Sequence, residues 1–124
     1  MKVALCVTVE PAETTVALVG RKNNVVVGTA AFRTRQYSYL EGIDRILTLA
    51  AHLEAESDSA IVAICMAVAG DVKGGVILDS STLGSWIGQR PGSDLKGLNV
   101  PMAVESRLEL DNLKKVATAA WQLA

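Results

Sequence analysis

Three short apolar runs rich in β-branched residues open the chain, and polar links separate them. The runs cover residues 2–9, 14–20 and 25–32. Such runs bounded by turn residues are typical of β-strands. Residues 21–24 link the second run to the third and include two asparagines, which tolerate the positive φ of a tight hairpin turn. The pattern therefore predicts a three-stranded antiparallel meander.

A helical periodicity follows the third run. Ser38 and Glu41 have the spacing of a capping box, in which a hydroxyl and a carboxylate satisfy free N–H groups at a helix start. Apolar residues then recur every three or four positions, which predicts a helix over residues 39–55. The stripe consists of Leu40, Ile43, Leu47 and Ala50, with Ile46 and Leu53 widening it. Residues 60–68 are almost all apolar and end before Gly70, a pattern typical of a strand buried on both faces and paired in parallel.

The remainder of the chain predicts a hairpin, a loop-rich stretch, a strand and a helix. Residues 74–78 form the hairpin arm, and residues 84–97 form the loop, with Pro91-Gly92 as a turn. Residues 100–104 are expected to form the strand, and residues 107–123 the helix. The apolar stripe of this last helix consists of Leu110, Leu113, Ala117, Ala120 and Trp121.

This order of elements predicts an α/β fold of the ribonuclease-H-like type. A meander followed by right-handed crossovers gives a mixed five-stranded sheet, with three antiparallel strands, two parallel strands and helices packed on it. The hairpin near residues 70–80 is an addition to this sheet. A chain of 124 residues is expected to form one domain.

Composition and charge restrict the classes of function. The chain is 50% hydrophobic with a formal net charge of −1, and no apolar run reaches the roughly 18 residues of a membrane helix. We expect a cytoplasmic protein, with no basic stripe for nucleic acid. Cys6 and Cys65 lie inside apolar runs and are expected to be buried thiols on neighbouring strands. One His and two separated Cys give no metal-ligand cluster.

Two segments resemble the N-terminal lobe of ROK-family sugar kinases and ROK repressors. Residues 64–86 read ICMAVAGDVKGGVILDSSTLGSW, and residues 100–107 read VPMAVESR. The corresponding family motifs are a strand ending in Pro-Gly, then Asn-Leu-x-x-Trp, then Glu-Asn-Asp. The resemblance implies an actin-like ATPase lobe of the ribonuclease-H-like class. It also implies that the family's C-terminal lobe and DNA-binding segment are missing from this chain.

The positions that bind phosphate and supply the base in the resembled kinases carry other residues here. The phosphate loop Asp-x-Gly-Gly-Thr falls on residues 8–12, where Thr8, Glu10 and Pro11 replace the Asp and both glycines. Proline has no N–H, and a carboxylate repels phosphate. The family's catalytic base falls on Arg107, which cannot accept a proton because guanidinium stays charged. Arg107 is either a surface charge in the first helical turn or an anion-binding group.

The resemblance also implies a set of sugar-binding positions. They are Gly70, Thr82, Trp86, Glu105 and Ser106. Thr82 stands where the family has Asn and offers fewer hydrogen bonds than an amide. Trp86 either stacks on a sugar or anchors its loop to the core. Glu105 is also explained as a first-turn acid that the helix N-terminus favours, and Gly70 as a plain turn glycine.

Three functions follow from these observations. The first is a catalytically inactive ROK-like lobe that serves as a structural or binding module, with a sugar as candidate ligand and with self-association or a partner lobe. It is expected to need no cofactor. The second is the N-terminal lobe of a working sugar kinase or a ROK regulator. A kinase would use ATP and Mg²⁺, with Asp71, Asp79 or Asp111 as substitute base. The third is a ribonuclease-H-like nuclease holding metal through Glu10, Asp71 and Glu105.

Overall fold

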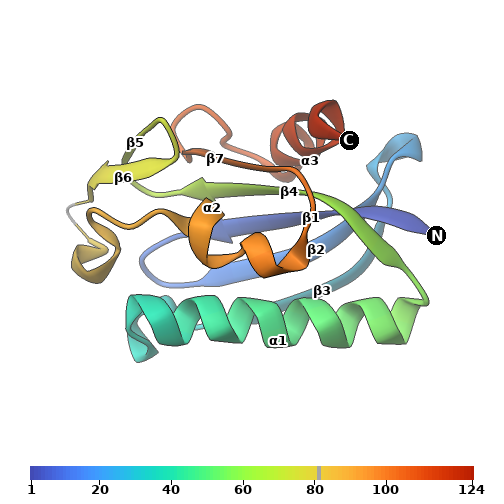
Figure 1. Cartoon of the computed structure of the whole chain (residues 1–124), viewed down its shortest axis with the longest axis horizontal. Coiled ribbons are helices and arrows are strands. Elements are labelled where there is room, and N and C mark those ends of the chain that lie inside the picture. The colour runs from blue at the N-terminus through green and yellow to red at the C-terminus, as the bar shows by residue number, and fades with distance from the viewer. Residues whose placement is uncertain (81) are drawn as a thin grey trace.

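The structure, a computed structural model, describes residues 1–80 and 82–124 (Figure 1). Its strands are β1 (Lys2–Val9), β2 (Thr14–Gly20), β3 (Val26–Phe32), β4 (Ala60–Val68), β5 (Asp71–Lys73), β6 (Val76–Asp79) and β7 (Met102–Ser106). Its α-helices are α1 (Tyr39–Ser57), α2 (Pro91–Asp94) and α3 (Leu113–Leu123). Short 3-10 turns cover Lys22–Asn24, Thr34–Gln36, Gly84–Trp86 and Lys96–Leu98. No helix in the described part of the chain is long and apolar enough to cross a bilayer.

Five strands form one mixed sheet in the order β3-β2-β1-β4-β7. The pairs β1/β2 and β2/β3 are antiparallel, whereas β4 and β7 run parallel to β1. This is the predicted ribonuclease-H-like arrangement. β5 and β6 form the separate hairpin predicted near residues 70–80. The hairpin turns at Gly74 and Gly75, whose φ angles of +59° and +78° favour glycine.

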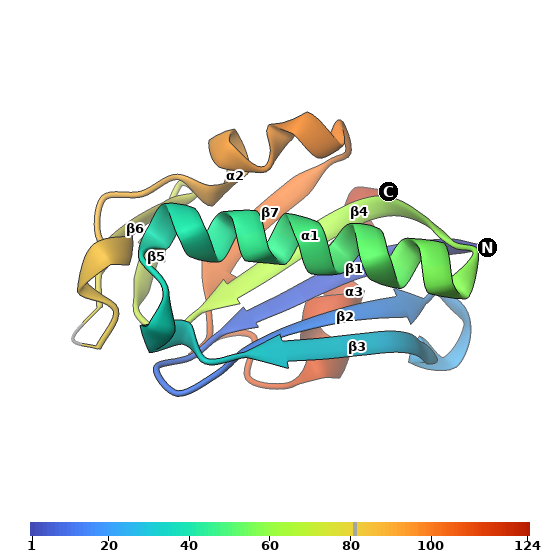
Figure 2. The same cartoon turned by 90° about the horizontal axis from the view of Figure 1, so that it is seen from below.

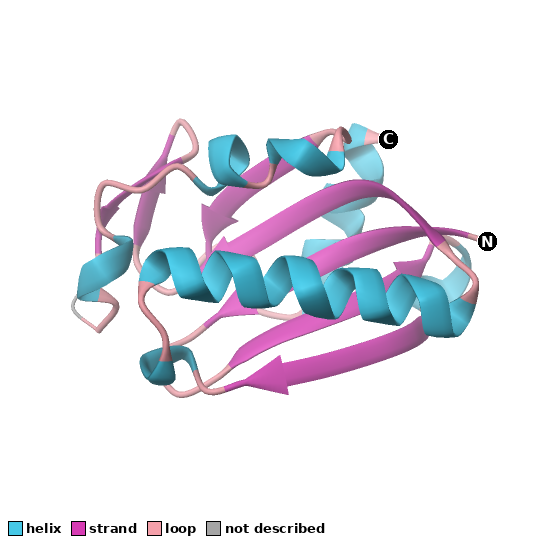
Figure 3. Ribbon diagram, turned by 60° about the horizontal axis from the view of Figure 1, so that its bottom comes forward, coloured by secondary structure: helices cyan, strands magenta, loops and turns pink. Residues whose placement is uncertain are grey.

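Helix α1 covers one face of the sheet (Figures 2 and 3). The capping box is present, since Glu41 N donates to Ser38 Oγ at 3.4 Å and Ser38 N donates to Glu41 Oε1 at 3.0 Å. The helix continues two residues beyond the predicted end at 55, to Ser57. The placement of Leu40 on the buried stripe was wrong, because its side chain is 68% exposed. Tyr39, at 2% exposure, occupies the inward position instead.

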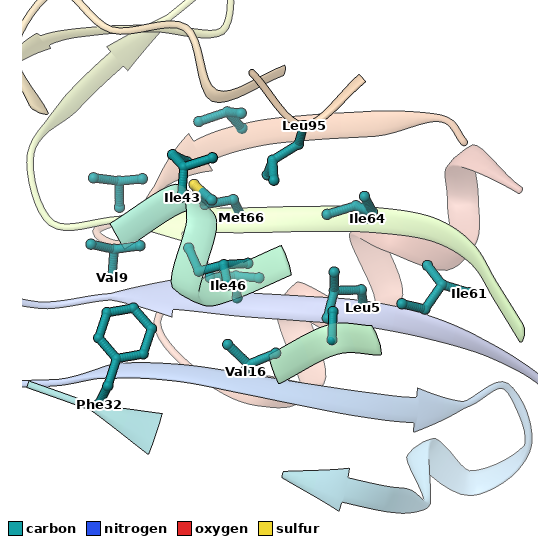
Figure 4. Packing of buried hydrophobic residues seen from close by; sticks show 14 of the residues in the cluster. Leu5, Val9, Val16, Phe32, Ile43, Ile46, Ile61, Ile64, Met66 and Leu95 are labelled. Atoms are coloured by element: carbon teal, nitrogen blue, oxygen red, sulfur yellow. The ribbon is translucent and has the colours of Figure 1, made fainter. Parts of the chain in front are cut away.

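The core under α1 contains most of the large apolar side chains (Figure 4). Leu5, Val9 and Val16 from the sheet meet Ile43 and Ile46 from the helix there. The predicted loop at residues 84–97 contains short helical turns, and this region adds Leu83, Trp86 and Leu95 to the core. Trp86 and Leu95 are 2% and 1% exposed. The loop is therefore a packed cover over the α1 side of β4 and β7.

Helix α3 covers the other face, which is lined by small residues. Val116, Ala117 and Ala120 pack against alanines and against Cys6 and Cys65. The two cysteines are register partners on β1 and β4 and both are buried, as predicted. Short side chains let the helix lie close to the sheet.

The boundaries predicted for β7 and α3 were wrong. The strand occupies Met102–Ser106 and not 100–104, and the helix begins at Leu113 and not at 107. Between them lies a turn in which Glu109 N and Leu110 N both donate to Ser106 O, each at 3.1 Å. Asn112 caps the helix by accepting from Lys115 N at 2.9 Å. This cap, and not the apolar stripe, sets where the helix starts.

Candidate functional site

The candidate site lies where β1, β4 and β7 end. Because these strands are parallel, their carboxyl ends meet at one edge of the sheet. They end at Val9, Val68 and Ser106, and are followed by the turns that contain Glu10, Gly70 and Arg107. Open sheets with parallel strands hold ligands outside this end. The fold therefore brings the predicted phosphate loop and the predicted base position to the same edge.

Glu10 and Arg107 form an ion pair that joins the turn after β1 to the turn after β7. Arg107 Nε donates to Glu10 Oε1 at 2.7 Å, and the two side chains are 24% and 48% exposed for Arg and Glu. Arg107 Nη1 also donates to the carbonyl oxygen of Leu110 at 2.7 Å. Arg107 N donates to Val68 O at 2.8 Å, which ties its backbone to β4. Arg107 is therefore held by three contacts and is not a loose surface charge.

The turn after β1 does not fit a phosphate group. Glu10 N donates within the turn to Glu13 O at 3.1 Å, and Pro11 has no N–H to offer. A phosphate cradle needs several free backbone N–H groups pointing at the anion. Here Glu10 adds a carboxylate to the turn, and Arg107 pairs with it. Two of the backbone N–H groups that such a cradle needs, those of residues 10 and 11, are therefore not available in this turn.

Thr8 and Glu105 lie in one row across the sheet, on the α3 side. Thr8 of β1 is the register partner of Ala67, and Ala67 is the register partner of Glu105. Ala67 belongs to the cluster under α3, and residues side by side on neighbouring strands share a face. Ser106 therefore points to the other face, with Val68. The explanation of Glu105 as a first-turn helix acid was wrong, since this residue is in β7.

Gly70 is required by a close approach of two chain segments. Its φ is +148°, and a Cβ at this position would lie 2.3 Å from Asp79 O. Ser106 Oγ donates to Gly70 O at 2.6 Å and accepts from Leu108 N at 3.2 Å. The Ser106 hydroxyl is thus occupied in holding the turn that contains Gly70. Both residues have a structural role whether or not a sugar binds.

Ser80 is a second hydroxyl that holds this turn, and the sequence motifs did not indicate it. It is buried, donates from Oγ to Ala69 O at 2.8 Å, and accepts from Leu83 N at 3.1 Å. A serine three residues before a buried leucine has the spacing of a local side-chain cap. That spacing is the feature of the sequence from which the role of Ser80 could have been predicted.

Trp86 is packed into the core and offers no ring face to a sugar. Its ring meets Tyr39 edge-on, with ring centroids 4.8 Å apart and an interplanar angle of 89°. Tyr39 Oη in turn donates to Asp94 Oδ2 at 2.5 Å, a link that the sequence pattern did not indicate. Of the two alternatives for Trp86, the buried ring therefore supports the loop anchor. Thr82 is exposed, and Ser81, in the same motif, lies outside the described residues.

The carboxylates proposed as substitute bases or metal ligands do not all meet in one site. Asp71 and Asp79 face each other across the β5–β6 hairpin and are both exposed. Asp111 pairs with Lys115 at 2.9 Å, and this hydrogen bond lowers the pKa of the Asp111 carboxyl. Among residues 1–80 and 82–124, no group of three His, Cys, Asp or Glu side chains is placed to hold a metal ion. The described residues therefore offer no set of metal ligands for a nuclease.

The sheet order and its covering helices define a lobe of the ribonuclease-H-like class, and solved ROK proteins share it. A ROK glucokinase from Streptomyces griseus, solved with glucose and AMPPNP, matches with a TM-score of 0.72 at 15% identity over 84% of this chain and 33% of its own. A ROK hexokinase from Thermus thermophilus matches with a TM-score of 0.71 at 14% identity over 84% of this chain and 35% of its own. A ROK transcriptional regulator, a homolog of the E. coli MLC protein, matches with a TM-score of 0.68 at 13% identity over 85% and 28%.

These likenesses confirm the resemblance to ROK proteins at the level of the fold. The sequence matches no family model and no curated protein. The chain spans about a third of the length of the glucokinase and the hexokinase. What this chain shares with them is therefore the fold of one part of those proteins.

Proposed function

We propose that this chain is a sugar-kinase-like lobe that binds a ligand or a partner and does not transfer phosphate. The observation that carries the proposal is the Glu10–Arg107 ion pair. The resembled kinases need a phosphate loop and a catalytic carboxylate at these two positions. Here an acid stands in the first and a permanent cation in the second, and the two side chains pair with each other.

The chemistry of these two positions supports the absence of phosphoryl transfer. A general base must accept the proton of the attacking hydroxyl, and an arginine side chain has no acceptor atom for it. A phosphate loop must present N–H donors and positive potential, whereas Pro11 lacks the donor and Glu10 brings negative charge. Replacing one of these positions would weaken a kinase, and both are replaced here.

A sugar is the small-molecule ligand that we propose, because the S. griseus glucokinase with this fold was solved with glucose. The group that remains available for it is the exposed Thr82 hydroxyl, since Glu105 lies on the α3 side of the sheet. Association with a second copy or with a separate partner lobe would cover the site at the carboxyl ends of β1, β4 and β7. We place the protein in the cytoplasm, as the composition predicts.

The experiment is a coupled assay of hexose-dependent ADP formation with a panel of hexoses, combined with calorimetric titration of the same hexoses. The proposal predicts no turnover above the buffer rate, and weak heats with at least one hexose. Hexose-dependent turnover would overturn the proposal. Thr82→Ala tests the sugar site, with Thr118→Ala, an exposed threonine on α3, as matched control.

A working kinase is the second candidate, because the S. griseus glucokinase of the same fold was solved with AMPPNP. It would require ATP and Mg²⁺ held by protein outside these 124 residues, and a base other than Arg107. Turnover in the coupled assay that survives Arg107→Ala would favour this candidate.

A further inference from the structure

The two edge strands of the sheet are protected very differently. β7 is five residues long and carries Glu105, and the hairpin strand β5 and helix α2 contact it. β3, at the opposite edge, spans seven residues without a charge or a proline. In the part of the chain that the structure describes, no strand pairs with its outer side (Figures 2 and 3). Natural proteins usually blunt such an edge with charges, proline or a covering segment.

The outer edge of β3 is regular and accessible. Its pairing with β2 has one irregularity, near Val26, and runs without interruption from Gly28 to Phe32. Exposed side chains near the start of the strand are apolar, since Val25 and Val26 are 52% and 44% exposed. The exposed side chains further along the strand include the small Thr29. A further strand can therefore approach this edge without meeting a bulky or charged side chain.

Basic side chains frame this neutral edge at both ends. Arg21 and Lys22 precede β3, and Arg33 and Arg35 follow it, all of them exposed. None of the four belongs to an ion pair within residues 1–80 and 82–124, although the Arg21 guanidinium lies over the Trp121 ring of α3, 5.5 Å from its centroid. The chain as a whole carries a net charge of −1, so the clustering is local and not a result of overall basicity.

An open groove of about 480 Å³ lies near the amino-terminal end of β3, between the β2–β3 turn and the start of β1. Its walls combine the cations Lys2, Arg21 and Lys22 with the apolar side chains of Val25 and Val27. Such a groove suits a segment that brings an apolar residue followed by an acid. Its chemistry is thus the same as that of the strand edge, an apolar surface beside positive charge.

We propose that β3 is a docking edge for an extended segment of another protein, which adds a sixth strand to the sheet. The segment has an uncharged, β-prone centre of about seven residues and acidic residues at both ends. Main-chain hydrogen bonds supply the affinity in this mode of recognition, and side chains supply the specificity. Because both ends of β3 are basic, the segment needs acids at both ends whether it runs parallel or antiparallel.

The same charges disfavour a second copy of the chain as the occupant. In a symmetric antiparallel pair of β3 strands, Arg21 and Lys22 of one copy would face Arg33 and Arg35 of the other. Like charges opposed across strands are destabilising. The basic frame thus acts against self-pairing and in favour of an acidic partner. This inference is independent of the proposed function, because neither Glu10 nor Arg107 is part of the edge.

The test uses a fluorescein-labelled peptide, Glu-Asp-Val-Thr-Val-Thr-Val-Thr-Val-Asp-Glu, titrated with the protein at 50 mM salt. Fluorescence anisotropy measures binding, and hydrogen exchange measures protection of the β3 amides. We expect saturable binding with slower exchange in β3. A peptide with lysines at both ends, or with prolines in its centre, is expected to bind at least ten-fold more weakly. Raising the salt to 500 mM is expected to weaken the acidic peptide similarly.

Charge-reversal variants distinguish binding to the basic residues at the two ends of β3 from nonspecific attraction between opposite charges. Lys22→Glu with Arg33→Glu should invert the preference, so that the lysine-ended peptide binds ten-fold better than the acidic one. Lys73→Glu with Lys96→Glu makes the same change in net charge away from β3 and should leave the preference unchanged. Three results would overturn the proposal: no binding of the acidic peptide, binding without protection of β3, or concentration-dependent dimers that protect β3 by themselves.

Discussion

At the scale of single residues, the ion pair between Glu10 and Arg107 fills the site without being a main source of stability. The Glu10 side chain is 48% exposed, and the pair has a distance of 2.7 Å. Partly exposed pairs are screened by water and salt and contribute little. The pairing of these two residues is therefore not required for stability, which makes their identity informative about function.

A double-mutant cycle measures how much the Glu10–Arg107 pair contributes to stability. Glu10→Ala, Arg107→Ala and the double variant should give a coupling energy of about 0.2–1 kcal/mol in urea unfolding. Arg107→Ala alone should cost more than Glu10→Ala alone, because it also removes the hydrogen bond to Leu110 O. A coupling energy above about 3 kcal/mol would mean that the pair is effectively buried.

Gly70 has the opposite character, with a strict steric requirement. Gly70→Ala is expected to destabilise the protein by about 1–3 kcal/mol or more, because its φ is +148° and the new Cβ would meet Asp79 O at 2.3 Å. Gly74→Ala is the matched control, since its φ is also positive but a Cβ added there would meet no atom within 4 Å. It should cost about 1 kcal/mol. Equal losses in thermal unfolding would contradict this explanation of Gly70.

At the scale of elements, sequence patterns predicted what depends on local chemistry. The Ser38–Glu41 capping box and the following stripe located the start of α1 at Tyr39, as found. The start of α3 was missed, because residues 107–112 continue an apolar spacing while the Arg107 contacts and the Asn112 cap fix a turn there. The Leu40 error has a similar cause. Periodicity alone does not tell which residue of a broad stripe faces the core.

Helix α3 provides a prediction that follows from this correction. Its buried contacts come from Val116, Ala117 and Ala120, whereas Leu113 and Trp121 lie half-buried at its rim. Val116→Ala should cost about 2 kcal/mol of unfolding free energy, because it removes two buried methyl groups. Leu123→Ala, at a side chain that is 37% exposed, should cost well under half as much. Urea unfolding of the two variants measures the difference, and the reverse order would contradict the packing of α3.

At the scale of the whole molecule, the sheet buries two thiols whose protonation is tied to folding. Burial raises the pKa of both Cys6 and Cys65 to about 12 from an ordinary value near 9.0, with a further contribution to Cys6 from Cys65 and to Cys65 from Glu105. A group with a raised pKa in the folded state stabilises the fold below its unfolded pKa and loses that contribution as the pH rises. The affected window is therefore roughly pH 9–12.

Wild-type protein should thus lose more stability between pH 8 and pH 10.5 than the variant with Cys6→Ala and Cys65→Ala. We expect a difference of about 4 kcal/mol, roughly 2 kcal/mol from each thiol, measured by urea unfolding at the two pH values. A thiol reagent should also react slowly at pH 8 until denaturant is added. Parallel stability curves for the two proteins, or rapid labelling of native wild type, would contradict the buried arrangement.

The candidate site shows where prediction from sequence reaches its limit. The replaced residues at positions 8, 10, 11 and 107 are visible in the sequence. Their arrangement is not, because Glu10 and Arg107 are 97 residues apart and meet only through the order of β1, β4 and β7. The burial of Trp86 against Tyr39 of α1 depends on tertiary contacts of the same kind. Long-range packing therefore decides which of the motif positions face the site and which hold the fold.

The most direct measurement is a titration of the 15N-labelled protein with Mg·AMPPNP, followed through the backbone amides of Glu10, Ala12 and Arg107. Glu10→Gly with Pro11→Gly restores an N–H donor and removes the carboxylate, and Glu13→Gly, at an exposed acid of the same turn, is the matched control. Wild type and the control are expected to show no saturable shifts up to millimolar nucleotide, while the glycine variant is expected to show the larger response. Saturation of the wild-type amides at micromolar nucleotide would contradict this expectation.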